Sequence, residues 1–142
     1  MTPAPAAWSP EPLQLLAAAA ELDVAARGPD GALRRWTPVW VVSVGEDVFV
    51  RSWHRRATGW FGHAVASERA RVRLPGLEAE VAVVDLGSQT GHLPGGGRRL
   101  GEVLDAVDAA YRVKYAALHG APTVAAMVSA QARATTLRLD PL

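Results

Sequence analysis

The sequence predicts a mainly β domain with flanking helices, folded as a small closed antiparallel barrel. Apolar segments follow one another across short turns, the longest helical pattern comes after most of them, and the expected strands number only six. A sheet with so few strands and apolar residues on both faces closes most economically into a barrel. At 142 residues the chain has the length of one domain with a single core, so we expect one domain over residues 1–142.

The first half of the chain is expected to hold a short helix and three strands. The motif "SPEP" is typical of a helix start, because serine caps the helix, proline fits its first turn and an acid suits its dipole. The motifs "GPDG" and "GED" indicate tight turns. Pro38 has no amide proton to donate, so we expect its strand at a sheet edge or a bulge. The expected segments are a flexible N-terminus over 1–9, a helix over about 10–20, and strands over 22–27, 33–44 and 48–53.

The second half is expected to hold one strand pair, several helices and a last strand. "WFGHAVASE" has the length of one or two helical turns, and "PG" separates two strands in "RARVRLPGLEAEVAVVDL", where arginines alternate with apolar residues. A glycine-rich loop over 87–99 carries no nucleotide-binding pattern. Apolar residues then recur at helical spacing from Leu100 to Leu118, and Gly120 can end that helix. A short helical segment near "TVAAMVSAQA" precedes a final strand in "ATTLRL".

Composition and motifs exclude several classes of function. The formal net charge of +1 disfavours general nucleic-acid binding, and no segment has the roughly 20 apolar residues of a membrane span. Cysteine is absent, and the four histidines lack a ligand spacing, so no metal site is predicted. No serine lies in a GxSxG motif. We expect a cytoplasmic protein, since the N-terminus does not resemble a signal peptide. Asp108 is expected to form an ordinary surface pair with Arg112, four residues later on the same helix.

The segment "RRWTPVWVVSVGEDVFVRSW" is apolar on both faces and nevertheless carries Arg51 on the face of Trp53. One face of the strand over 37–44 can line the barrel, while the other must meet a helix, a second subunit or a flat ligand. A buried guanidinium needs a partner, so Arg51 either forms a salt bridge beside an aromatic ring or binds an anion in a cleft. Tyr115 has the same two alternatives, helix core or cleft.

Four segments together resemble a known family: "LRRWTPVWVVSVGEDVFVRSW", "GWFGHA", "DAAYRVKYA" and "ATTLRL". They are similar to the small bacterial family catalogued as domain of unknown function 2255, over roughly residues 12–140. That family is similar in turn to the flavin-binding split barrels, which include pyridoxamine-phosphate oxidase and the deazaflavin-dependent reductases. The resemblance implies a six-stranded split barrel that forms a homodimer, with FMN or deazaflavin and a small-molecule ligand at the seam between the subunits.

The resemblance also implies where the cofactor would bind. In the relatives, one strand runs along the flavin ring, and a serine with basic residues binds the phosphate. The residues that match the ring strand are Thr37, Pro38, Val39 and Trp40, and those that match the phosphate region are Ser52, Arg55 and Arg56. Arginine suits phosphate oxygens, and a planar ring prefers an apolar slot. This chain also inserts Trp53, Trp60 and Phe61, whose rings would stack on a cofactor or take its place.

Three functions are compatible with these residues. The first is a flavin- or deazaflavin-dependent oxidoreductase that acts on a small organic substrate. The second is a cofactor-free cyclase or isomerase of a tailoring pathway, with an aromatic pocket of Trp40, Trp53 and Trp60. Arg51 and Tyr115 would be its catalytic residues and would polarise an oxygen of the substrate. The third is a non-catalytic ligand-binding dimer.

Overall fold

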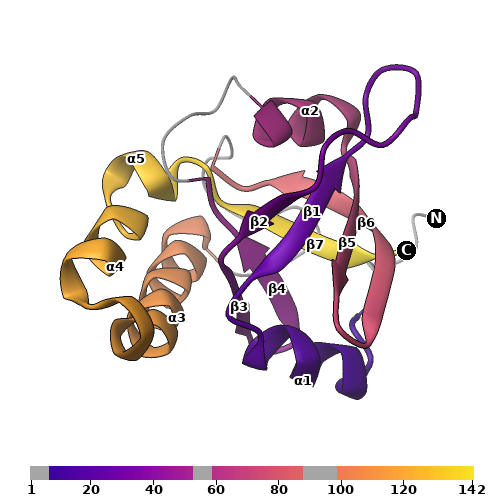
Figure 1. The fold of residues 1–142 in the computed structure, drawn as a ribbon. Helices are drawn as coiled ribbons and strands as arrows, with labels where there is room; N and C mark the ends of the chain where they lie inside the picture. The colour runs from indigo at the N-terminus through magenta and orange to yellow at the C-terminus, as the bar shows by residue number, and fades with distance from the viewer. Residues whose placement is uncertain (1–6, 53–58, 88–98) are drawn as a thin grey trace.

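The computed structural model describes residues 7–52, 59–87 and 99–142. A curled antiparallel sheet forms its centre, with helices at both ends of the sheet and a group of three helices along one side (Figure 1). The helices are α1 (Pro10–Ala18), α2 (Gly59–Ser67), α3 (Leu100–His119), α4 (Ala121–Met127) and α5 (Ala130–Arg133). The strands are β1 (Leu22–Ala26), β2 (Thr37–Val39), β3 (Val41–Val44), β4 (Asp47–Val50), β5 (Arg69–Leu74), β6 (Leu77–Asp85) and β7 (Leu137–Pro141).

The sheet has seven strands rather than the six expected from the sequence, because the predicted strand over 33–44 is two strands. The strand order is β2-β1-β5-β6-β7-β4-β3, and every neighbouring pair is antiparallel. β2 and β3 lie at opposite ends of this order, yet only Trp40 separates them in the chain. The chain therefore turns at Trp40 and joins the two edges of the sheet, which gives it a barrel-like form. Pro38 lies in the edge strand β2, as its missing amide proton predicts.

Two apolar clusters bury the two faces of the sheet. The first fills the barrel interior and includes Val41, with Phe61 of α2 packed into it. The second lies between the outer face of the sheet and α3 and includes Val42 and Tyr115. Val41 and Val42 are neighbours and both fully buried, because successive side chains of a strand point to opposite faces. A helix thus covers the second apolar face of this segment.

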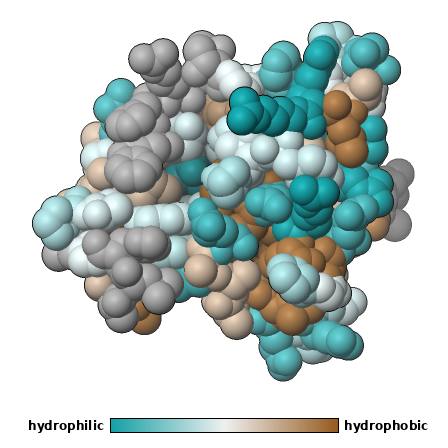
Figure 2. Space-filling view, in the orientation of Figure 1, coloured by the Kyte–Doolittle hydropathy of each residue, from teal (hydrophilic) through white to brown (hydrophobic). Residues whose placement is uncertain are grey.

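The polar surface of the sheet follows the alternation seen in the sequence. Ala70 and Val72 of β5 are buried, while Arg71 and Arg73, which alternate with them, point outward and form ion pairs with acids on neighbouring strands. Arg71 pairs with Glu78, and Arg73 pairs with Asp23. Figure 2 shows hydrophilic side chains over much of the face that β1 and β5 present. Surface pairs of this kind contribute little stability singly, and their main consequence is to keep this face solvated.

Other expectations meet the structure at particular residues. Only residues 7–9 of the expected flexible N-terminus are described, and there Trp8 is buried and donates an indole hydrogen bond to the Leu139 carbonyl over 2.9 Å. Most of the glycine-rich loop lies outside the described residues. The last strand begins at Leu137 instead of Ala134, because the hydroxyls of Thr135 and Thr136 donate to the carbonyls of Ala132 and Arg133 at the end of α5. No helix in the described part of the chain has the length and apolar character that a membrane crossing requires.

Candidate functional site

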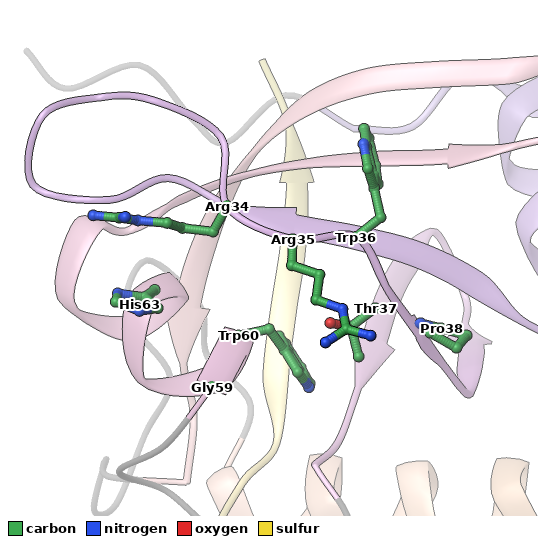
Figure 3. A pocket seen from close by; sticks show the side chains of 8 residues that line it. All are labelled: Arg34, Arg35, Trp36, Thr37, Pro38, Gly59, Trp60 and His63. Carbon is green, nitrogen blue, oxygen red and sulfur yellow. The ribbon is translucent and has the colours of Figure 1, made fainter.

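A pocket of about 570 Å³ lies between β2 with its preceding residues and the start of α2 (Figure 3). Its lining residues are Arg34, Arg35, Trp36, Thr37, Pro38, Gly59, Trp60 and His63. This volume lies within the range of about 300–1,000 Å³ that is typical of sites for one small molecule. The lining residues combine aromatic and apolar side chains with guanidinium groups.

The alternation of β2 decides which side chains meet inside this pocket. Arg35 and Thr37 are two residues apart and point toward Trp60, while Trp36 points to the other side of the chain (Figure 3). β2 pairs only with β1, as the terminal strand of the sheet order. Among the described residues, β2 is therefore an edge strand, and its Pro38 lines the pocket.

The rings of Trp36 and Trp60 each pack against another side chain. The guanidinium carbon of Arg73 lies 4.0 Å from the centroid of the Trp36 ring, and Arg73 in turn pairs with Asp23 across 3.5 Å. Trp60 meets the buried ring of Phe61 edge to face, with centroids 5.7 Å apart. Neighbouring residues at the start of α2 thus place one ring in the core and the next ring against the pocket.

The four residues that were expected to run along the cofactor ring, 37–40, do not all lie in the pocket. Thr37 and Pro38 line the pocket, as does Trp60, which was expected in the substrate pocket. Val39 is 7% exposed and packs into the barrel interior. Trp40 belongs to the second cluster, on the outer face, so the structure does not bring Trp40 and Trp60 together. The turn at Trp40 separates them, because it moves the chain from one sheet edge to the other.

The remaining predicted binding residues lie elsewhere or are not described. Trp53, Arg55 and Arg56 lie outside the described residues. Ser52 is not in the lining of the pocket, and its backbone is bound on both sides to the Thr135 hydroxyl, at 3.0 Å through the amide and 2.9 Å through the carbonyl.

Arg51 lies in a buried network. Its side chain is fully buried, and Nη1 lies 2.6 Å from a carboxylate oxygen of Asp108 and 2.8 Å from the Met127 carbonyl. Nε donates to the hydroxyl of Thr136 over 2.9 Å, and the guanidinium carbon lies 5.4 Å from the Tyr111 ring centroid. Burial lowers the pKa of Arg51, and the hydrogen bond that Arg51 donates to Asp108 opposes that shift. This is the salt-bridged alternative, and the geometry favours a structural role over contact with a substrate.

The expected surface pair between Asp108 and Arg112 is wrong. Asp108 is 5% exposed and faces inward, where Arg51 binds one carboxylate oxygen and Arg133 binds the other. Arg112 is exposed. Spacing by four residues brings two side chains near each other on a helix but does not require them to pair. The partners of Asp108 instead lie 57 and 25 residues away in the chain.

Tyr115 is also buried, and its hydroxyl binds the backbone at the sheet corner. It accepts a hydrogen bond from the amide of Val41 over 3.0 Å and donates one to the Ala20 carbonyl over 2.7 Å. Burial raises its pKa to about 12. The adjacent Lys114 donates to the Val41 carbonyl over 2.6 Å and to the Leu16 carbonyl over 3.2 Å. Burial lowers the pKa of Lys114 to about 8.

Sequence reasoning missed five pocket residues: Arg34, Arg35, Trp36, Gly59 and His63. The signal for three of them was present in "RRWTP", since cationic and aromatic residues directly before an edge strand are typical of a binding surface. His63 had no such signal, because its place depends on how α2 packs on the barrel. In residues 7–52, 59–87 and 99–142, no three His, Asp or Glu side chains are grouped as metal ligands would be.

The fold and the pocket define an antiparallel barrel-like domain with a candidate ligand site at an edge strand. Residues 12–139 match the profile of a family described as an uncharacterised protein conserved in bacteria, DUF2255. Because the match spans most of the chain, the protein belongs to this family. No curated protein sequence matches the chain.

Two solved structures are similar to the whole chain or most of it. One is a conserved hypothetical protein, Rv2991, from Mycobacterium tuberculosis, with a TM-score of 0.55 and 14% identity, over 100% of this chain and 84% of that one. The other is an F420 reductase, with a TM-score of 0.44 and 16% identity, over 90% of this chain and 89% of that one. The likeness to the first shows a shared fold.

Proposed function

We propose that the protein binds a flavin-type cofactor, FMN or deazaflavin, in the pocket between β2 and α2, and that it is an oxidoreductase acting on a small organic substrate. One observation carries the proposal: a pocket of about 570 Å³ beside edge strand β2 is lined by the rings of Trp60 and Pro38 and by the Arg35 guanidinium. The resemblance of "TPVW" to the ring-binding strand of the flavin-binding split barrels supports it as well.

The residues present fit such a cofactor. A flavin joins a flat ring system to an anionic chain, and the pocket offers a surface for each part. The indole of Trp60 and the ring of Pro38 suit the flat part, because aromatic rings prefer stacked or edge contacts and exclude water. The Arg35 guanidinium and the Thr37 hydroxyl suit the anionic part, because they donate hydrogen bonds to anionic oxygens.

The roles of the chain follow from this fit. Pro38 would lie along the ring, Trp60 would cover it, and Arg35 with Thr37 would hold the anionic chain. A bound flavin or deazaflavin supplies hydride transfer, which no protein side chain provides. The chain's own residues would orient the ring and keep water from it. The family resemblance further supports a homodimer, with the second subunit completing the site.

Absorption spectra and native mass of the purified protein test both parts of the proposal. We expect saturable binding of FMN or of the deazaflavin F420, and a native mass of twice the 15.0 kDa chain. Trp60→Leu should weaken the binding about 2- to 12-fold, since stacking on an aromatic ring contributes about 0.5–1.5 kcal/mol beyond burial of its area. Trp40→Leu, whose ring lies outside the pocket, is the matched control. Absence of saturable uptake of both cofactors would contradict the proposal.

The structure gives less support to a cofactor-free cyclase or isomerase. Its proposed polarising groups, Arg51 and Tyr115, are buried and bound to other parts of the chain. A non-catalytic ligand-binding protein differs from the proposed oxidoreductase only in turnover. Reduction of the bound cofactor without transfer to any organic acceptor would favour it.

A further inference from the structure

We propose that the pocket selects planar aromatic anions, and that Arg35 with Thr37, rather than the neighbouring Arg34, is its anion receptor. This proposal deepens the proposed function and rests on it for the site, while it holds equally for a flavin phosphate and for a free aromatic acid. In this proposal, Arg35 is the residue that makes the pocket prefer an anionic ligand over a neutral one.

The Arg34 side chain lies against the loop that joins β1 to β2. Its guanidinium lies 3.9 Å from the Asp30 carboxylate, and it fills the space beside Gly28, where an added Cβ would lie 2.3 Å from its Nε. The loop is closed by a hydrogen bond of 2.9 Å from the Gly28 amide to the Ala32 carbonyl. The Arg34 amide donates to the Ala26 carbonyl over 2.8 Å. Arg34 therefore lies at the rim of the pocket and has an acid near its guanidinium, which Arg35 lacks.

Arg35 differs from Arg34 in its polar partners. Within the described ranges, neither its guanidinium nor the Thr37 hydroxyl makes a hydrogen bond or an ion pair. The two side chains lie on the same side of the chain and face Trp60 (Figure 3). None of the described lining residues is an acid. Two donors that converge on a site without a counter-charge favour an anionic oxygen group.

The surroundings of Arg35 determine the rest of the ligand. In the view of Figure 3 the Arg35 side chain lies between the Trp60 indole and Pro38, and all three residues line the same pocket. A simple inorganic anion would leave these apolar surfaces uncovered. A flat ring that carries one carboxylate or phosphate would cover them and place its charge at Arg35, so the ligand class is a planar aromatic anion.

Isothermal titration calorimetry with two matched ligand pairs tests this inference. FMN and riboflavin share a ring system and differ in the phosphate, while 1-naphthoic acid and 1-naphthalenemethanol differ in the carboxylate. We expect wild-type protein to prefer the anion of at least one pair by about 10- to 100-fold, the range of a hydrogen bond to a charged group. Arg35→Gln should reduce that preference to less than about threefold, and Thr37→Val should reduce it partly. Arg34→Gln should reduce it less than Arg35→Gln does, and Arg112→Gln, at an exposed arginine of α3 that does not line the pocket, is the matched control and should leave it within about twofold.

The outcomes separate this inference from the proposed function. An Arg35-dependent preference for FMN over riboflavin supports both. The same preference in the naphthalene pair alone, without flavin binding, supports the inference and contradicts the flavin proposal. Flavin binding without a preference for the anion overturns the inference and leaves the flavin proposal standing. Binding of neither pair, or an equal effect of Arg34→Gln and Arg35→Gln, also overturns it. Circular dichroism and the melting temperature of each variant verify that it is folded.

Discussion

Trp40 and Tyr115 stack face to face, with ring centroids 4.2 Å apart and ring planes 3° apart. Trp40 stands at the turn that joins the two edges of the sheet, and Tyr115 belongs to α3. The same tyrosine binds the backbone of Val41, and Tyr111, one turn earlier, donates a hydrogen bond to the Trp40 carbonyl over 3.1 Å. The helix therefore satisfies backbone groups that the break between β2 and β3 removes from the strand ladders.

Tyr115→Phe should destabilise the protein by about 1–3 kcal/mol, because the buried amide of Val41 loses its hydroxyl partner while the ring stack remains. Urea unfolding followed by circular dichroism measures the change. Tyr111→Phe removes a single hydrogen bond to a carbonyl and should cost less, so it is the matched control. Equal stability of Tyr115→Phe and wild type would contradict the structural role of this hydroxyl.

Arg51→Met should destabilise the protein by about 3–5 kcal/mol, the effect of removing one partner from a buried ion pair. The double variant Arg51→Met/Asp108→Leu should be more stable than Arg51→Met alone, because it removes the second buried charge as well. Arg112→Met, on the exposed side of α3, should change the stability by less than about 0.5 kcal/mol. A large loss of activity in Arg51→Met with unchanged stability would instead indicate contact with substrate.

The stability of the protein should rise between pH 8 and pH 10 through Lys114. Burial lowers the folded-state pKa of this lysine to about 8 from an ordinary value of 10.5, so in this window the unfolded chain binds more protons than the folded one. Above pH 10 the raised pKa of Tyr115, about 12, acts in the opposite direction. Unfolding free energies of wild type and Lys114→Met should therefore differ in slope between pH 8 and pH 10. Parallel curves would contradict the shift.

Gly87→Ala should destabilise the protein by about 3 kcal/mol or more, or prevent folding, because steric overlap with backbone cannot be relieved by a rotamer change. A Cβ at Gly87 would lie 1.8 Å from the Ala134 carbonyl oxygen. Gly101→Ala is the matched control, since a Cβ there meets nothing within 4 Å and alanine favours the helix by up to about 1 kcal/mol. Thermal unfolding measures the melting temperatures of both variants. Equal melting temperatures for Gly87→Ala and Gly101→Ala would contradict the prediction.

Local patterns in the sequence were sufficient for most single elements. The spacing of apolar residues predicted α3, whose observed bounds are Leu100–His119, and the turn "PG" predicted the pair of β5 and β6. The missing amide proton of Pro38 predicted an edge strand. Each of these elements depends on interactions between residues close together in the chain, so a single sequence is sufficient to predict the element.

The sequence by itself determined the class of the fold and the family. Only the tertiary structure decided that the segment around "RRWTPVW" breaks at Trp40, that Arg51 binds Asp108, and that Arg35 faces Trp60 while Arg34 is paired with Asp30. The physical reason is the distance along the chain between partners. Arg51 and Asp108 are 57 residues apart, and Val41 and Tyr115 are 74 apart, so no local periodicity records which of several charged or polar residues will meet.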